Sequence, residues 1–493
     1  MLNFKFKIMK KLLLNIVLIV GISLASVSCD RNLDEVNIDE SRISEPVASK
    51  LLVPIQYNMS AVNYMRANDF TFDIMQVSLD FPNEGNTLSR YNITENTGAG
   101  FWNNSYKWLK QIKDMRAAAE RDNDPNYQAI SMVLNAWVYS NLTDTYGDVP
   151  FSEASVLDGG ITQPKFDRQK DIYVKLLDDL KTANSLFVTT KLLTGSDIFY
   201  KAESDVNGIV NWKKFCNSLS LRLLTRILKK NGEVNVNERI LEIINDPVKY
   251  PLIQSNAETT KVNVTGVAPL LPPIARPQDF TTGRAASAFF VETLKANNDP
   301  RMALFFGQAK NIAPPQANIG YKGAPTGYAY GTTFDYQPSN MNQNLSKAPL
   351  NILVFPYAEL QFILSELVWR GIITGNAQTF YENGVKATIE QWGSTMPANY
   401  FTNQSVAYNG SLERIMLQKY VALFFVDQQQ WFEKRRTGFP VLPNNGGLLN
   451  NGIMPSRLMY PPNPRVLNTS NYQAAVQQMG GDDINVKVWW NKP

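Results

Sequence analysis

Histidine is missing from this chain of 493 residues, and cysteine occurs only twice. The absence of histidine excludes Ser–His–Asp and Cys–His catalytic groups. It also excludes zinc sites that need imidazole ligands. Hydrolysis of a glycosidic bond needs only two acids, so a glycosidase that uses a carboxylate pair is an enzymatic alternative that stays open.

The chain also carries little excess charge of either sign. Its 48 Lys and Arg residues against 44 Asp and Glu residues give a formal net charge of +4. Segment 1–28 contains four lysines and no acid, so the remainder of the chain is formally neutral. A nucleic-acid surface would need a basic stripe, and the composition gives no indication of one.

Long apolar runs are scarce, and the first of them is informative. Four lysines within residues 5–11 precede an apolar run at 12–20, which is too short for the roughly 20 residues of a membrane span. Small residues follow, directly before Cys29. This order is typical of a secretory signal. Two interpretations stay open. Cys29 is either a functional part of this signal, or the signal is an ordinary secretory one and the cysteine is incidental.

A cysteine at the cleavage point resembles the signal of a bacterial lipoprotein. That resemblance implies a signal peptide at 1–28 and a lipid attached to Cys29 (palmitate among the expected groups). Residues 29–43 are polar and acidic, which predicts a flexible tether. The second cysteine, Cys216, lies in an apolar-periodic stretch and is expected to be a small buried hydrophobe rather than a nucleophile.

Apolar residues recur at helical spacing over much of the remaining chain. Ile130, Val133, Leu134 and Trp137, for example, follow the i, i+3, i+4, i+7 rule. The segments with helical character are 102–121, 130–142, 172–187, 215–228, 355–373, 376–393, 411–429 and 470–479. No alternation of strands and helices is visible, and stacked helix pairs are the natural interpretation.

Two stretches interrupt this helical pattern. Prolines crowd residues 246–283, and residues 311–349 combine proline and glycine with several tyrosines. Prolines break helices, while the aromatic side chains argue against simple disorder. We therefore expect a loop-rich insert at approximately 246–350 within a domain that extends over residues 44–493.

Several segments of this domain match the sequence motifs of one protein family. The first is NAWVYSNLTDTYGDVPFSEA at 135–154, a helix that Gly147 can end, followed by a YGDVP turn. The others are WKKFCNSLSLR at 212–222, NDPR at 298–301, PYAELQFILSE at 356–366 and QQWFEKRRTGFP at 429–440, together with the end of the chain. In this order they resemble the SusD-like (SusD/RagB) outer-membrane lipoproteins. Cys216 and Ser365 stand where that family usually has alanine.

The resemblance implies a mainly α fold with a core of tetratricopeptide-like helix pairs in a solenoid, and an irregular, loop-rich subdomain packed on it. It also implies a lipid-anchored protein of the outer membrane, exposed at the cell surface. Such a protein captures an oligosaccharide or another nutrient and delivers it to a partner, a SusC-like TonB-dependent transporter. No enzymatic activity and no cofactor are expected. A surface glycosidase and a lid that binds nothing itself remain the alternatives.

Most signature residues are expected to be structural. Trp431, Arg435 and Arg436 could bind an anion, but nearby acids could equally satisfy the arginines inside the protein. Asp148 and Glu153 are expected to cap helices or turns.

Sugar binding calls for exposed aromatic faces with amides nearby. Aromatic residues of this kind lie in the two stretches that interrupt the helical pattern, and the segment 102–104 places a tryptophan next to two asparagines. The alternative is that these rings pack against their own loop and fix its conformation, as in many compact long loops. The predicted ligand-binding residues are Trp102, Asn103, Phe280, Tyr321, Tyr328, Tyr330 and Tyr336.

Metal binding has little support in the sequence. Acids at 122–124 and 482–483 offer oxygen atoms of the kind calcium prefers. Neither pair lies in an EF-hand loop, and no metal site is expected.

Overall fold

The computed structural model describes residues 45–82, 85–154 and 160–493. It divides into two units, Met1–Pro46 and Val47–Pro493. The predicted signal peptide, the lipidated Cys29 and the tether lie outside the described residues. Within the described ranges, no helix is both long and apolar enough to cross a membrane.

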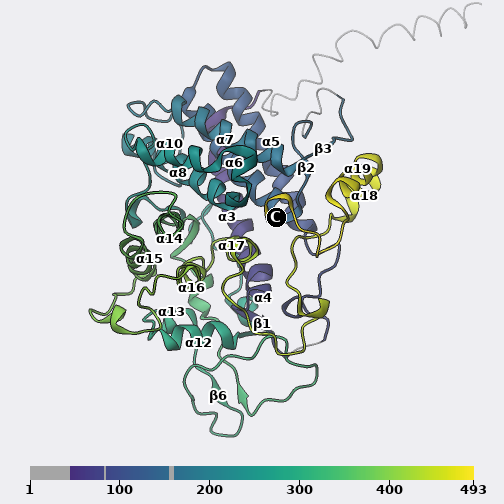
Figure 1. The fold of residues 1–493 in the computed structure, drawn as a ribbon, viewed down its shortest axis with the longest axis vertical. Coiled ribbons are helices and arrows are strands. Elements are labelled where there is room, and N and C mark those ends of the chain that lie inside the picture. Colours follow the sequence, from purple (N-terminus) through teal and green to yellow (C-terminus); the bar gives the residue numbers. More distant parts are fainter. Residues whose placement is uncertain (1–44, 83–84, 155–159) are drawn as a thin grey trace, which may run out of the picture. The chain divides into compact units, whose positions relative to one another are not determined.

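Helices dominate the unit Val47–Pro493, as predicted. Helices adjacent in the sequence pack on one another: α5 against α6, α6 against α7, and α7 against α8 (Figure 1). This stacking of successive helices is the expected tetratricopeptide-like core. The first group comprises α3 (Ala48–Arg66), α4 (Phe72–Ile74), α5 (Ala99–Arg121), α6 (Pro125–Tyr146), α7 (Gln169–Leu186), α8 (Val206–Arg226), α9 (Asn231–Val234) and α10 (Val236–Asn245).

Helix α6 shows how the sequence sets the ends of an element. The Asp124 carboxylate accepts hydrogen bonds from the backbone N–H groups of Asn126 (3.0 Å) and Tyr127 (3.2 Å), as a cap does. Pro125 occupies the first position, where no N–H is needed. The helix ends before Gly147, whose φ of +88° disfavours other residues. Helix α6 is buried over most of its length, so it forms the centre of the stack.

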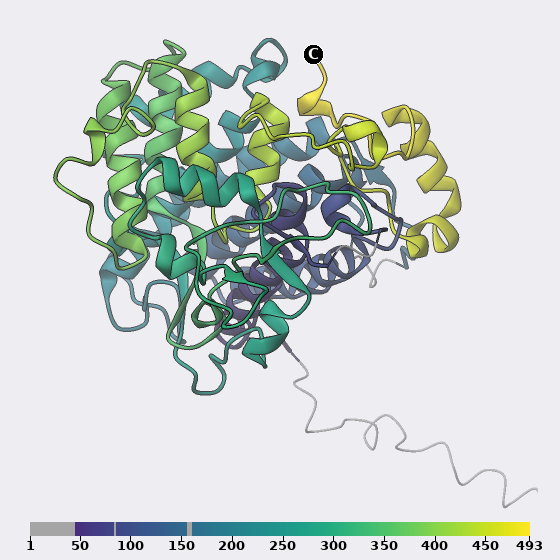
Figure 2. The same ribbon diagram turned by 90° about the horizontal axis from the view of Figure 1, so that it is seen from below.

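A second group of helices packs beside the first through α8 and α14. Helices α14, α15 and α16, coloured green, lie side by side in both views (Figure 1, Figure 2). This group contains α14 (Tyr357–Trp369), α15 (Ala377–Gln391), α16 (Leu412–Ala422) and α17 (Gln429–Thr437). The helices of the loop-rich parts are α11 (Pro277–Thr281), α12 (Ala288–Ala296), α13 (Met302–Phe305), α18 (Pro462–Leu467) and α19 (Thr469–Met479).

The prediction of one helix over 411–429 was wrong in its second half. Helix α16 ends at Ala422, and Phe425 and Asp427 adopt positive φ angles of 61° and 39°. Tertiary contacts favour this break: the Phe425 ring stacks on Tyr64 with 4.3 Å between centroids. The Asp427 carboxylate meanwhile accepts a 3.0 Å hydrogen bond from Asn141.

The strands of the described residues are short and pair antiparallel, two at a time. The pairing of segments 78–80 and 284–286 joins distant parts of the chain, whereas that of 310–311 and 336–337 lies within the loop-rich insert. The pairs are β1 (Ser78–Asp80) with β5 (Arg284–Ala286), β2 (Val149–Pro150) with β3 (Phe166–Asp167), β4 (Thr260–Val264) with β8 (Leu350–Phe355), and β6 (Lys310–Asn311) with β7 (Tyr336–Gln337).

Candidate functional site

The signature arginines lie inside the protein. Arg436 donates to both carboxylate oxygens of Glu366 at 2.6 Å and to Glu433 at 2.5 Å, and all three side chains are buried. Burial alone would raise the pKa of Glu433, but Arg436 and the neighbouring Lys419 hold it well below its usual range. Arg435 lies over the ring of the buried Trp431, 4.3 Å from its centroid. These contacts confirm the structural interpretation of the QQWFEKRRTGFP segment.

Asp148 and Glu153 both bind backbone N–H groups, but only Asp148 does so at a helix start, as predicted. Asp148 accepts a 2.8 Å hydrogen bond from the backbone N–H of Gln169, the first residue of α7. Glu153 accepts one of 2.9 Å from the backbone N–H of Lys165. Cys216 is also buried as predicted, and burial raises the pKa of its thiol.

Trp102 and Phe280 offer no free ring face, contrary to the expectation of accessible aromatics. Helix α5 begins at Ala99, so Trp102 lies in its first turn, where the ring packs 5.0 Å from Tyr146 and is 6% exposed. Phe280 is 1% exposed and stacks on Phe425. Asn103, one position beyond Trp102, is exposed to solvent.

The four tyrosines of segment 321–336 divide into two kinds. Tyr328 and Tyr336 are each 8% exposed and Tyr321 is half-buried, whereas Tyr330 is 72% exposed. Phe334 packs edge-on against both Tyr328 (5.1 Å) and Tyr336 (5.7 Å). The self-packing alternative therefore describes most of these rings, and Tyr330 is the one left on the surface.

Tyr330 lies where three distant segments meet. A Cβ added to Gly85 would lie 3.7 Å from the Tyr330 ring, so that ring runs alongside the chain at 85. The Arg90 guanidinium donates to the carbonyl oxygens of Gly85 (2.5 Å) and Gly447 (2.6 Å). Gly447 in turn packs so closely on Gly327 that a Cβ there would lie 1.8 Å from its carbonyl oxygen. We call segments 85–92, 326–336 and 444–449 together the tyrosine-loop surface.

Amide side chains accompany the exposed ring. Asn86 and Asn444 are exposed, and the exposed Asn445 donates a 2.7 Å hydrogen bond to the Thr326 carbonyl oxygen. An exposed aromatic face with amides on the same surface is the composition expected of a sugar-binding site.

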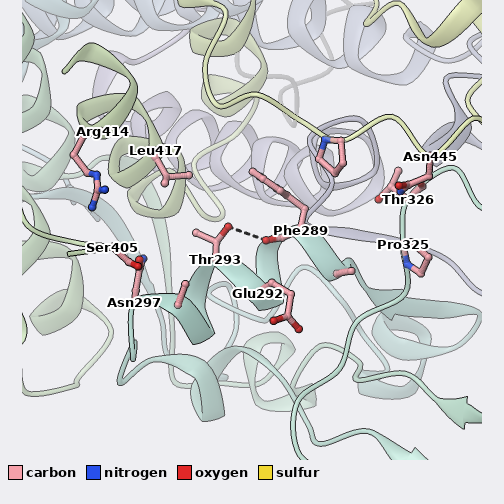
Figure 3. Close-up of a pocket in the computed structure, with 13 residues that line it drawn as sticks. Phe289, Glu292, Thr293, Asn297, Pro325, Thr326, Ser405, Arg414, Leu417 and Asn445 are labelled. Atoms are coloured by element: carbon pink, nitrogen blue, oxygen red, sulfur yellow. Dashed lines mark hydrogen bonds between the residues drawn. The ribbon is translucent and has the colours of Figure 1, made fainter. Parts of the chain in front are cut away.

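A pocket of about 540 Å³ adjoins the tyrosine-loop surface (Figure 3). Pro325 lies beside that surface, and Thr326 and Asn445 belong to both. The remaining walls come from α12 and Asn297 directly after it, from Ser405, from α16 and from Pro443. Sequence reasoning missed this pocket because its residues come from separate segments, and none of them stands in a recognisable motif.

No cluster of three or more His, Cys, Asp or Glu side chains that could hold a metal ion occurs in the described part of the chain. Asp482, a candidate calcium ligand by sequence, instead forms ion pairs with Arg457 (3.0 Å) and Arg465 (3.2 Å). Asp124, from the other acidic segment, is the cap of α6.

Comparison with solved structures identifies many similar folds. A chitin-binding protein is 26% identical, with a TM-score of 0.76 over 90% of this chain and 100% of its own. A SusD homologue from Bacteroides fragilis is 24% identical, with a TM-score of 0.75 over 91% and 100% of the two chains. A chitin-binding SusD homologue from Flavobacterium johnsoniae is 22% identical, with a TM-score of 0.75 over 90% and 98%. No curated protein sequence matches.

The family model described as "Starch-binding associating with outer membrane" matches residues 40–461. This match includes the helical core, the tyrosine-loop surface and the buried signature segments. Because the match extends over most of the sequence, the chain belongs to the SusD-like family.

Proposed function

We propose that this protein is a non-catalytic lipoprotein of the cell surface that captures a glycan and delivers it to a TonB-dependent outer-membrane transporter. The observation that carries the proposal is the Tyr330 ring, which is 72% exposed on a loop whose other aromatic rings are packed. Sugars stack their C–H faces on such rings. The description of the family as starch-binding, and of one similar structure as a chitin-binding protein, supports a glycan ligand.

In this proposal the predicted residues have different roles. Tyr330 stacks on the sugar, and the exposed amides of Asn86 and Asn444 bind its hydroxyl groups. Tyr321, Tyr328 and Tyr336 shape the loop that presents Tyr330, while Trp102 and Phe280 belong to the main hydrophobic core. Asn103 is a further exposed amide, on α5.

The acids that line the pocket of Figure 3 favour binding over hydrolysis. A glycosidase needs two carboxyl groups about 5–10 Å apart on either side of the bond that it cleaves. Among the described residues that line the pocket of Figure 3, Glu292 is the only acid. A bound glycan should therefore be recovered unchanged. The release of reducing ends by the purified protein would contradict the proposal.

Calorimetric titration with a panel of chito- and malto-oligosaccharides tests the site. Complete burial of one ring by the ligand contributes about 1–3 kcal/mol, so Tyr330→Ala should weaken binding roughly five- to hundred-fold. Tyr330→Phe keeps the ring and should retain most of the affinity. Neither change should lower the melting temperature appreciably, because the ring is exposed.

Tyr328→Ala is the matched control in the same loop. Its ring is buried, so this variant should lose stability, and with it the loop that presents Tyr330. If Tyr330→Ala binds every glycan as tightly as the natural protein does, the site lies elsewhere. If no glycan binds the natural protein at all, the lid that only closes the transporter is the better interpretation.

The partner is tested separately. The chain outside segment 1–28 is formally neutral, so long-range steering should be weak and the interface should depend on apolar and polar contacts. Affinity purification from gently solubilised membranes should recover a TonB-dependent barrel. Repeated recovery of the lipoprotein alone would count against delivery to a transporter.

A further inference from the structure

The pocket of Figure 3 contains a positive charge without a matching carboxylate. Within the described residues no carboxylate oxygen lies within 4 Å of the Arg414 guanidinium, and its Nη1 is buried without a hydrogen-bond partner. The Tyr381 hydroxyl interacts with Arg414 but donates to the Val406 carbonyl oxygen. Burial raises the pKa of Tyr381, so this neighbour stays neutral near pH 7.

A second donor without a partner lies in the same wall. Asn297 is 1% exposed, and its Nδ2 has no hydrogen-bond partner among the described residues. Figure 3 shows Arg414, Ser405 and Asn297 at one end of the pocket. Buried donors are almost always satisfied in proteins, and leaving one unpaired is unfavourable. The Arg414 Nη1 and Asn297 Nδ2 atoms are covered in the wall of this end of the pocket, so an acceptor in the pocket would pair with them once these side chains turn towards it.

The other charges at the pocket do not supply that acceptor. Glu292 lines it but is exposed and pairs with Lys295 at 3.0 Å, on the same helix. Glu413, next to Arg414 in sequence, is exposed. Exposed carboxylates are well solvated, and their field is screened by salt.

The rest of the pocket suits a sugar ring or its substituents. Phe289 and Leu417 provide apolar surface in the lining of the pocket. Figure 3 shows Pro325, Thr326 and Asn445 at the end away from Arg414, where the pocket adjoins the tyrosine-loop surface. An oligosaccharide bound at Tyr330 could thus place one of its monosaccharide units in the pocket.

We propose that this pocket accepts an oxyanion-bearing sugar of the captured glycan, either a uronate carboxylate or a sulfate ester, with Arg414 and Asn297 as its donors. The inference rests on the proposed glycan capture and adds the class of glycan. Arginine suits the task because its planar fork matches an oxyanion with two parallel hydrogen bonds.

Calorimetry with matched ligand pairs tests this assignment on the detergent-purified full-length protein. One pair is oligogalacturonate and its methyl ester, and the other is a sulfated carrageenan oligosaccharide and its desulfated form. A charge-assisted contact should favour the acidic member of at least one pair by about ten- to hundred-fold. The pair that shows the preference identifies the oxyanion.

Variants then assign the preference to the pocket. Arg414→Gln should bring the ratio of affinities close to one while neutral glycans keep their affinity, and Arg414→Lys should retain part of the ratio. Lys295→Gln removes an exposed positive charge near the same pocket and should leave the ratio unchanged. Thermal melts identify any variant that fails to fold, and the ligand pairs with the natural protein test the proposal without any variant.

The outcomes separate the two proposals. Equal affinities within both pairs, or a preference that survives Arg414→Gln, would overturn the oxyanion site. If Tyr330→Ala still weakened all members in that case, glycan capture would stand alone. If no member of either pair and no neutral glycan bound, glycan capture itself would fail and the oxyanion site would fall with it.

Discussion

Replacement of Glu366 by glutamine tests whether the buried ion pairs of the signature segments hold the helices together. Glu366 on α14 is completely buried and binds Arg436 on α17 through two hydrogen bonds of 2.6 Å. It also accepts a 2.8 Å hydrogen bond from Arg370. Glutamine has nearly the same shape, so Glu366→Gln removes the negative charge and leaves the packing almost unchanged.

The expected loss follows from burial. Removing one partner of a buried ion pair costs about 3–5 kcal/mol, because the other charge stays in a medium of low polarity. The compact unit has about 450 residues, and unfolding entropy is roughly 2.1 cal/mol/K per residue. The entropy of unfolding is then about 0.9 kcal/mol/K, so the melting temperature should fall by about 3–5 °C.

An exposed ion pair of similar length is the matched control. Arg116 and Glu120 on α5 lie 2.8 Å apart, with both side chains exposed. Such pairs contribute about 0.5 kcal/mol or less, so Glu120→Gln should lower the melting temperature by less than about 1 °C. Scanning calorimetry of both variants at pH 7 makes the comparison. Equal shifts in the two variants would refute the argument that burial makes the signature pairs important.

Three further predictions follow from other features. Arg436 and Lys419 lower the pKa of Glu433. The stabilisation by the ionised Glu433 carboxylate is therefore complete above the usual pKa of 4.5 and is lost as the pH falls towards the lowered pKa. Below pH 4.5 the melting temperature should consequently decline less in Glu433→Gln than in the natural protein. Gly447→Ala would place a Cβ 1.8 Å from the Gly327 carbonyl oxygen and should reduce glycan affinity by displacing the Tyr330 loop, which titration of a folded variant would detect. Cys29→Ala should abolish labelling by radioactive fatty acid and release the protein from the membrane fraction; undiminished labelling would contradict the lipid anchor.

Helical periodicity predicted the core because each helix buries one or more faces. The predicted segment 102–121 corresponds to α5 (Ala99–Arg121), and the segment 172–187 corresponds to α7 (Gln169–Leu186). The end of α6 was also predicted, because Gly147 acts through local backbone geometry, whereas its start at Pro125 precedes the predicted segment 130–142. Local rules of this kind need no knowledge of distant contacts.

Features that depend on distant contacts were not predictable in the same way. The asparagine-rich start of α5 suggested an accessible Trp102, but Tyr146 and Tyr460 cover its ring. The left-handed Phe425 interrupts an apolar pattern that alone indicates a continuous helix, because its ring stacks on Tyr64. The pocket at Arg414 is likewise assembled by tertiary packing.

The residues that reveal the family and the residues proposed to choose the ligand are different sets, and the structure gives a physical reason. Arg436 and Glu366 are buried and paired, so a change in either one leaves a buried charge and costs several kcal/mol. Tyr330 is exposed and Arg414 lacks a carboxylate partner among the described residues, so replacing either should cost the fold far less. The signature segments therefore constrain the scaffold, while the tyrosine-loop surface and its pocket are free to differ between chains with the same core. The ligand has to be inferred from the tyrosine-loop surface and its pocket, and the motifs by which the family is recognised carry little information about it.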